Sequence, residues 1–91
     1  MPADIIFITS EQSVVFGADV KLDCWSKGVP APDMAWMRDQ NVLVKGERTV
    51  ILELHNVTWQ DEGVYMCEAN NSGGNDNTRT KVNVVGECFK L

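Results

Sequence analysis

The sequence predicts an all-β fold, either a sandwich or a barrel, on two observations. Short apolar stretches recur along the 91 residues, and residues typical of turns separate them. In several stretches apolar side chains alternate with their neighbours, which is the period of a half-buried strand, and helical periodicity is absent. The length suits one small domain, and no internal repeat is present.

The first part of the chain is expected to supply three strand segments. Residues 5–8 form a short strand, and residues 14–16 form a second piece of it that is shifted to another edge. After a turn at residues 17–19, valine, leucine and cysteine in residues 20–25 alternate with lysine, aspartate and tryptophan, which predicts a half-buried strand. Residues 28–33 end this strand, because their two prolines each remove a donor from any ladder.

The middle of the chain predicts two more strands. Residues 34–37 alternate and form a strand, and residues 39–41 form a turn. A short apolar piece at residues 42–44 and a polar, exposed stretch at residues 45–48 follow. In residues 50–55 a valine and two leucines alternate with their neighbours, which predicts a further half-buried strand.

The last part predicts two strands joined by a polar hairpin loop. Residues 56–63 connect to a strand at residues 64–69, where tyrosine, cysteine and alanine alternate with valine, methionine and glutamate. Residues 70–77 are very polar, contain two glycines and are expected to form the loop. The final strand contains Val82 and Val84.

Composition argues against several classes of function. The chain has 13 acidic and 8 basic side chains and a net charge of −5, so a nucleic-acid partner is not expected. No apolar run approaches the roughly 20 residues of a membrane span, and the N-terminus lacks the basic and apolar regions of a signal peptide. His55 is the only histidine, so we expect no enzyme, no metal site and no cofactor.

Four residues form a framework with a characteristic order. Cys24, Trp36 and Cys67 each fall on the inward phase of a predicted strand, and Tyr65 comes two residues before Cys67. The turn at residues 61–63 precedes the tyrosine. A cysteine, a tryptophan and a second cysteine in this order, with a tyrosine before the second cysteine, are typical of one class of β-sandwich.

On these residues the sequence resembles the immunoglobulin superfamily, and most closely its I-set (intermediate) type. The resemblance covers residues 4–85. The spacing from Trp36 to Leu52 is shorter than in variable-type domains, which fits the absence of a second hairpin strand between the sheets. The motifs that carry the resemblance are Leu22-x-Cys24, Gly28-x-Pro30-x-Pro32, Leu52-x-Leu54-x-Asn56-Val57, Asp61-x-Gly63-x-Tyr65-x-Cys67 and Ala69-x-Asn71-x-Gly73.

The resemblance implies an all-β, two-sheet antiparallel immunoglobulin-like sandwich with Greek-key connections. It implies a disulfide between Cys24 and Cys67 that joins the sheets across the core, with Trp36 packed on it. It also implies that the Tyr65 hydroxyl bonds to the backbone near Asp61 and locks the corner. The other positions assigned to the framework are Leu54 and Gly63.

One candidate interface follows from the side-chain phase of three strands that share a sheet in such a sandwich. If Trp36, Tyr65 and Cys67 point inward, their neighbours give the outer face an apolar centre with a polar rim, as in protein–protein contacts. The alternative is that a neighbouring loop or domain covers this face, or that its apolar residues are simply exposed. The outward residues are Ala35, Met37, Val64 and Met66 in the centre, with Glu68 and Lys81 at the border.

Two tryptophans are further candidates. Trp25 and Ile51 fall on outward phases of strands expected to pair, and Lys21 and Glu53 are expected to form a cross-strand charge pair. An exposed tryptophan suits an interface, but we favour local packing of Trp25 on the first strand or the linker. Trp59 is either an anchor for a neighbouring domain or, more commonly, packs over the end of its own sandwich.

Two sequence motifs and the third cysteine concern the cellular context. Asn56-Val57-Thr58 and Asn70-Asn71-Ser72 match the N-glycosylation rule, either as used sites or as chance matches. Cys88 is left over from an odd count and lies beyond the last strand. It forms a disulfide with an adjoining region or another chain, or it is a remnant whose partner has been cut away.

These observations favour an extracellular recognition module of a cell-surface receptor or adhesion protein, with the membrane reached only through the parent protein. The expected partners are a protein ligand or another copy of the chain, and neighbouring domains. The alternatives are an intracellular structural I-set module of a muscle or cytoskeletal protein, where thiols stay reduced, and a ligand-binding or spacer domain of a receptor tyrosine kinase ectodomain. We expect residues 1–3 to be an extension or expression start, residues 4–85 the domain, and residues 86–91 a linker or truncated tail.

Overall fold

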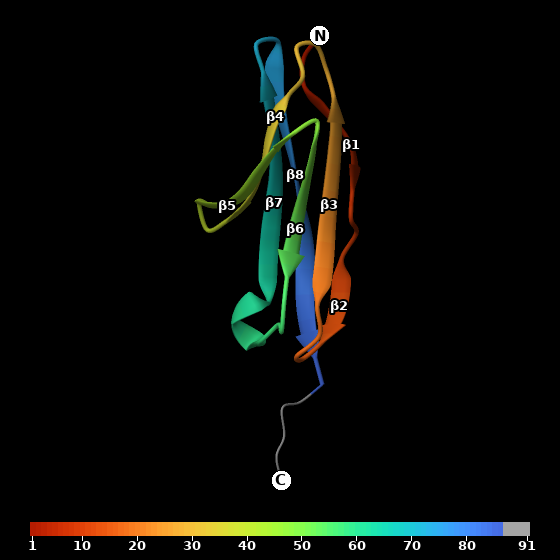
Figure 1. Cartoon of the computed structure of the whole chain (residues 1–91), viewed down its shortest axis with the longest axis vertical. Coiled ribbons are helices and arrows are strands. Elements are labelled where there is room, and N and C mark those ends of the chain that lie inside the picture. Colours follow the sequence, from red (N-terminus) through yellow and green to blue (C-terminus); the bar gives the residue numbers. More distant parts are fainter. Residues whose placement is uncertain (87–91) are drawn as a thin grey trace.

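The computed structural model describes residues 1–86 of the chain, which form an almost entirely β structure (Figure 1). Within these residues, no helix is long and apolar enough to cross a membrane. The elements are, in order, β1 (Asp4–Ile8), β2 (Gln12–Val15), β3 (Val20–Lys27), β4 (Asp33–Arg38), β5 (Asn41–Glu47), β6 (Thr49–Leu54), the 3₁₀ helix η1 (Trp59–Asp61), β7 (Gly63–Asn71) and β8 (Gly74–Val85).

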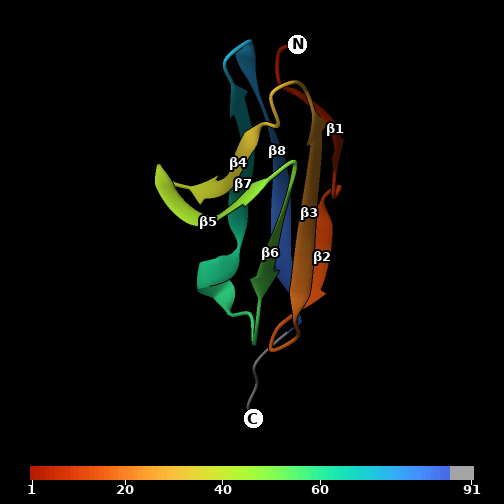
Figure 2. The same cartoon turned by 45° about the horizontal axis from the view of Figure 1, so that its top comes forward.

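The strands form two sheets packed face to face, which confirms the predicted sandwich (Figures 1 and 2). The small sheet has the strand order β1-β3-β6, and the large sheet has the order β2-β8-β7-β4-β5. Neighbouring strands run antiparallel except β2 and β8, which run parallel. β1 and β2 lie in different sheets, so the first strand is split between two edges as the sequence predicted.

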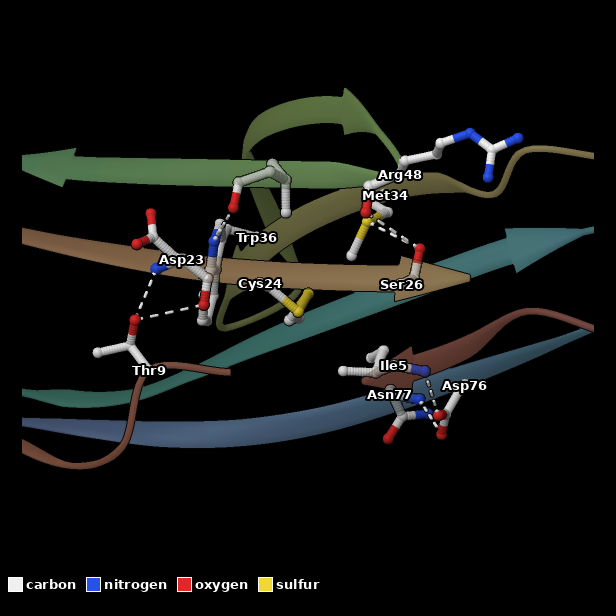
Figure 3. The surroundings of a disulfide bond; sticks show 12 residues. Ile5, Thr9, Asp23, Cys24, Ser26, Met34, Trp36, Arg48, Asp76 and Asn77 are labelled. Carbon is white, nitrogen blue, oxygen red and sulfur yellow. Dashed lines mark hydrogen bonds between the residues drawn. A yellow bond between two sulfur atoms is a disulfide. The ribbon is translucent and has the colours of Figure 1, made fainter. Parts of the chain in front are cut away.

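A disulfide between Cys24 of β3 and Cys67 of β7 joins the two sheets through the core, as predicted. Trp36 lies beside it and is fully buried, and its indole Nε1–H donates to the Val50 carbonyl oxygen at 3.2 Å (Figure 3). Apolar side chains from both sheets surround the bridge, and the half-buried Leu54 packs against them. One covalent bond and one shared apolar core therefore hold the sheets together.

The prediction of a polar loop at residues 70–77 is wrong. β7 continues to Asn71 and β8 begins at Gly74, so only Ser72 and Gly73 form the turn. Most side chains of this hairpin tip are exposed, and a backbone ladder forms there without apolar side chains. The alternation that marks a half-buried strand is therefore missing from a segment that is nevertheless extended.

The segment after the Trp36 strand is also more regular than predicted. β5 is one continuous edge strand that pairs with β4, and Leu43 is the extra residue at a bulge. Arg48 alone separates β5 from β6, and its φ of 66° reverses the chain. The short spacing between Trp36 and Leu52 thus corresponds to a missing strand, as predicted.

The first three residues pack against the end of the sandwich that carries the β7–β8 hairpin. Ala3 is buried, and the Met1 ammonium group donates to the Val29 carbonyl oxygen at 2.9 Å. Asn71 fixes this arrangement, because its Nδ2 donates to the carbonyl oxygens of Met1 at 2.7 Å and Pro30 at 2.9 Å. Its Oδ1 accepts from the Ala3 N–H at 3.1 Å. Asn71 therefore joins the N-terminus to two loops, a role that sequence reasoning missed.

Candidate protein interface

The outer surface of the large sheet, here called the methionine face, is centred on Val42, Met37, Val64 and Met66. The β4–β7 pairing sets Met37 opposite Met66, and the β4–β5 pairing sets Val42 opposite Met37. Val42 and Val64 are 49% and 50% exposed, and the two methionines are partly exposed. The structure therefore places the three predicted interface residues of this face side by side and adds Val42.

A bulge explains why sequence reasoning missed Val42. Trp36 pairs with Val44 and Met37 pairs with Val42, so Leu43 has no partner on β4. A bulge interrupts the strict alternation of side chains along a strand. The period that predicted the other three residues therefore does not hold across this position, and no feature of the sequence marks the bulge.

Charged side chains surround the apolar centre. The register sets Arg79 opposite Met66 and Lys81 opposite Val64, and a surface hollow lies between the methionines and Arg79. The rim residues are Asp33, Lys45, Glu47, Glu68, Arg79 and Lys81. In the described part of the chain, none of these six makes an ion pair within 4 Å. An apolar centre within a charged rim is the composition of a protein contact surface.

The outer surface of the small sheet, here called the tryptophan face, carries Phe7, Trp25 and Ile51. The rings of Phe7 and Trp25 pack together with their centroids 4.7 Å apart. Trp25 therefore contacts the first strand of its own chain, which is the arrangement of the local-packing alternative. It retains 45% exposure, and Ile51 retains 43%.

The expected ion pair between Lys21 and Glu53 is not formed within 4 Å, although these residues lie opposite each other in the β3–β6 register. The Glu53 carboxylate lies 3.8 Å from His55 Nε2, and the Asp19 carboxylate lies 3.4 Å from His55 Nδ1. These contacts are exposed, so each contributes little to stability. Among residues 1–86, no group of three or more histidine, cysteine, aspartate or glutamate side chains is placed to hold a metal ion.

Trp59 packs against its own domain at the other end of the sandwich. Its ring centroid lies 5.2 Å from that of Phe16, and 50% of the residue stays exposed. A capping box holds η1, because the Thr58 N–H donates to the Asp61 carboxylate at 2.8 Å and the Gln60 N–H donates to Thr58 Oγ1 at 3.3 Å. The tryptophan therefore covers the end of the core and keeps one accessible side.

A tyrosine corner holds the start of β7. The Tyr65 hydroxyl donates to the Asp61 carbonyl oxygen at 2.6 Å, as the resemblance implied. Arg38, which the sequence did not single out, donates to the Tyr65 oxygen at 3.1 Å and to the Glu62 carbonyl oxygen at 2.6 Å. Burial raises the pKa of Tyr65 above its usual value, although the charge of Arg38 opposes this. At Gly63 a Cβ would lie 3.1 Å from Arg38 Nη2, so glycine fits here.

Both glycosylation motifs present their asparagine at the surface. Asn56 follows β6 with a φ of 53°, and its N–H donates to Asp19 Oδ1 at 3.0 Å. This bond, together with His55, lowers the pKa of the Asp19 carboxyl below its usual value. Asn70 is exposed on β7 beside the rim of the methionine face. Cys88 and most of the predicted linker lie outside the described residues.

The inter-sheet bridge, the buried tryptophan and the tyrosine corner define the fold as an immunoglobulin-like sandwich. The model of the immunoglobulin domain family matches residues 4–71. The chain is 34% identical to contactin-1a of Danio rerio over 90 residues, which are 93% of this chain and 9% of that protein. It is 35% identical to myelin-associated glycoprotein of Homo sapiens over 90 residues, 98% of this chain and 14% of that protein. The chain belongs to the immunoglobulin superfamily.

Other relatives widen the range of parent proteins. The chain is 35% identical over 88 residues to a vascular endothelial growth factor receptor kdr-like protein of Danio rerio, 89% of this chain and 7% of that protein. The fold matches a titin M10–obscurin-like 1 Ig complex with a TM-score of 0.84 at 26% identity, over 93% of this chain and 94% of that one. The curated relatives are cell-surface proteins, whereas titin is intracellular. Domains of this family are typically non-enzymatic.

Proposed function

We propose that this domain is an extracellular recognition module that binds a protein partner through the methionine face. The observation that carries the proposal is the apolar centre of that face, surrounded by six charged side chains that make no ion pair in residues 1–86. A surface of this composition gains from burial at its centre and from oriented charges at its rim.

The centre offers enough apolar surface to contribute to binding. Val42 and Val64 are 49% and 50% exposed, so covering each of them contributes about 1 kcal/mol. Met37 and Met66 add flexible, polarisable side chains that adapt to the shape of a partner. The rim charges then set the orientation and the association rate more than the affinity.

A second copy of the chain is one partner that this surface suits, and a different protein is the other. Sedimentation equilibrium of the chain and of the Met66→Lys variant distinguishes them. A dimer that Met66→Lys abolishes identifies the second copy as the partner. A monomer in both cases rules out homophilic binding and assigns the face to another protein.

Three features support an extracellular location. The Cys24–Cys67 disulfide persists most readily in an oxidising compartment. Asn56 and Asn70 are both exposed within glycosylation motifs. The curated relatives are cell-surface proteins. The likeness to the kdr-like receptor supports a receptor kinase ectodomain as one form of this proposal.

The likeness to the titin M10 complex favours a second candidate, an intracellular structural module. Mass spectrometry of the full-length protein, isolated from its own cells, decides between the two. The extracellular proposal predicts glycans on Asn56 or Asn70 and an oxidised Cys24–Cys67 pair. Free thiols together with unmodified asparagines would contradict it and favour the structural module.

We also propose that residues 4–85 are the folding unit and that residues 86–91, with Cys88, form a linker to a further part of a longer protein. β1 begins at Asp4 and β8 ends at Val85, which supports these limits. The same mass spectra identify the residue to which Cys88 is bonded. A Cys88 disulfide to another domain or chain is the result that this proposal predicts.

A further inference from the structure

The two lateral sides of the sandwich differ in how the sheets end. On one side the chain crosses from the small sheet to the large sheet between β1 and β2, and the Ile5 N–H donates to Asp76 Oδ2 at 2.9 Å across that side. On the other side β5 ends the large sheet, β6 ends the small sheet, and only Arg48 separates them (Figure 2). This second side therefore presents two strand edges that pair with no further strand in the described residues.

The two free edges are not equally protected against pairing. β5 has a bulge at Leu43 and an exposed Lys45, which are two features that discourage the addition of another strand. β6 (Thr49–Leu54) pairs with β3 in an uninterrupted register and contains neither lysine nor proline. Glu53 is its only charged residue. The edge of β6 is therefore available to a partner strand.

A surface hollow lies beside this edge, between β5 and β6, and we call it the side groove. Leu43 and Ile51 are 44% and 43% exposed there. In Figures 1 and 2, β5 extends past β6 on this side, so a strand added to β6 would lie over β5. The side groove is lined by Leu43, Val44, Ile51, Leu52 and Glu53.

We propose that the side groove binds an extended segment of another polypeptide, which adds as a strand to the free edge of β6. The unpaired backbone groups of β6 require hydrogen-bond partners with the spacing of a strand, which specifies an extended backbone. Leu43 and Val44 favour apolar side chains at alternate positions of that segment, and Glu53 favours a lysine or arginine between them. Because β5 projects past β6, the groove suits a single strand better than a second sandwich.

This site is independent of the methionine face, because it lies at the lateral edge of the two sheets. The probe for it is an acetylated and amidated heptapeptide in which valine alternates with lysine and threonine. Two further versions of the peptide carry backbone N-methyl groups on alternate residues, one version in each phase. Only one phase of the peptide N–H groups faces β6, so N-methylation in that phase removes the hydrogen bonds while the other phase leaves them intact.

Titration of the ¹⁵N-labelled chain with these peptides tests the proposal. We expect amide resonances of Thr49–Leu54 and of Leu43 and Val44 to shift with the parent peptide and with one N-methylated version. The other N-methylated version should produce no shift. No shift in β6 with the parent peptide would overturn the proposal, and so would equal binding of all three peptides.

Two matched variants locate the binding on the correct surface. Leu43→Lys places a charge in the side groove and should weaken binding of the parent peptide at least about tenfold. Val64→Lys makes a similar change at a residue of similar exposure on the methionine face, and should leave peptide binding unchanged. Equal weakening by both variants would overturn the proposal. Loss of a methionine-face partner in Val64→Lys, by contrast, concerns the proposed function alone.

Discussion

The methionine face and the tryptophan face both expose apolar side chains, but only the tryptophan face supplies an aromatic partner from its own chain. Trp25 packs on Phe7 with centroids 4.7 Å apart, so a neighbouring strand covers one side of its ring. On the methionine face, Met37, Met66 and Val42 lie in one cross-strand row. An outward phase alone therefore does not define an interface. What distinguishes the two faces is whether the same chain provides the contact.

The charges of the two faces differ in the same way. On the small sheet, Lys27 lies 4.0 Å from the Asp4 carboxylate, and His55 lies 3.8 Å from that of Glu53. The six rim charges of the methionine face have no such partner within residues 1–86. The chain thus pairs charges on one face and leaves them free on the other, where an external partner is able to use them.

The largest expected effect concerns the bond that carries both faces. Replacing Cys24 and Cys67 by alanine removes the only covalent link between the sheets in the described chain. The closed loop of about 44 residues corresponds to about 4 kcal/mol in the chain-entropy model. Chemical denaturation should show this loss of unfolding free energy. An unchanged denaturation midpoint would contradict the role assigned to the bridge.

The next effect separates the two faces directly. Trp25→Ala removes the contact with Phe7 and loosens β1, so the unfolding free energy should fall by about 2 kcal/mol, because Trp25 is only partly buried. Val64→Ala on the methionine face should lower it by less than about 0.5 kcal/mol. Thermal unfolding of the two variants, measured side by side, gives the comparison. Equal losses would mean that the two faces have the same structural role.

A smaller effect is expected at the corner that positions β7 beneath the methionine face. Tyr65→Phe removes the hydrogen bond to Asp61 and one acceptor of Arg38, which should lower the unfolding free energy by about 1.5 kcal/mol. Tyr65 is the only tyrosine, so phenolate absorbance reports its pKa directly. Burial penalises the phenolate, and the measured pKa should lie above 10.0 in the folded chain. A titration at or below that value would contradict the buried hydrogen-bonded hydroxyl.

The smallest expected effect lies at the end of the small sheet. The pKa of Asp19 is lowered by the Asn56 N–H and by His55, so the folded chain favours the carboxylate. This contribution to stability is present above the unfolded pKa of 3.8 and disappears as the pH falls through the folded pKa. Asp19→Asn should therefore lower stability slightly at neutral pH and not below pH 3. A difference between the two chains that grows on acidification would contradict this sign.

The parts of the fold that follow a strict period were predictable from the sequence. Alternation places Cys24, Trp36 and Cys67 inward, and the same alternation places Met37 and Met66 outward on one face. A two-residue period is a local property of a strand, so a single sequence contains it. The family resemblance then supplied the pairing of the cysteines.

The parts that depend on interruptions or on distant partners were not predictable. Val42 reaches the methionine face through a bulge, and bulges leave no periodic signal. Asn71 bonds to Met1, and Arg38 bonds to Tyr65, across long stretches of sequence. Such hydrogen bonds arise from the assembled structure, so the residue types alone do not reveal them. The hairpin tip, 70–77, was missed because an exposed strand needs no apolar residues.

Methionine oxidation tests the central claim, that the methionine face is the contact surface, most directly. Mild peroxide treatment of the full-length protein in its native assembly, followed by mass spectrometry, gives the oxidation rates of Met37 and Met66, and the isolated 91-residue chain gives the reference rates. Met34 is 2% exposed and should react slowly in both samples, which makes it an internal control. We predict that Met37 and Met66 react more slowly in the assembly than in the isolated chain. Equal rates for both methionines in the two samples would contradict the account.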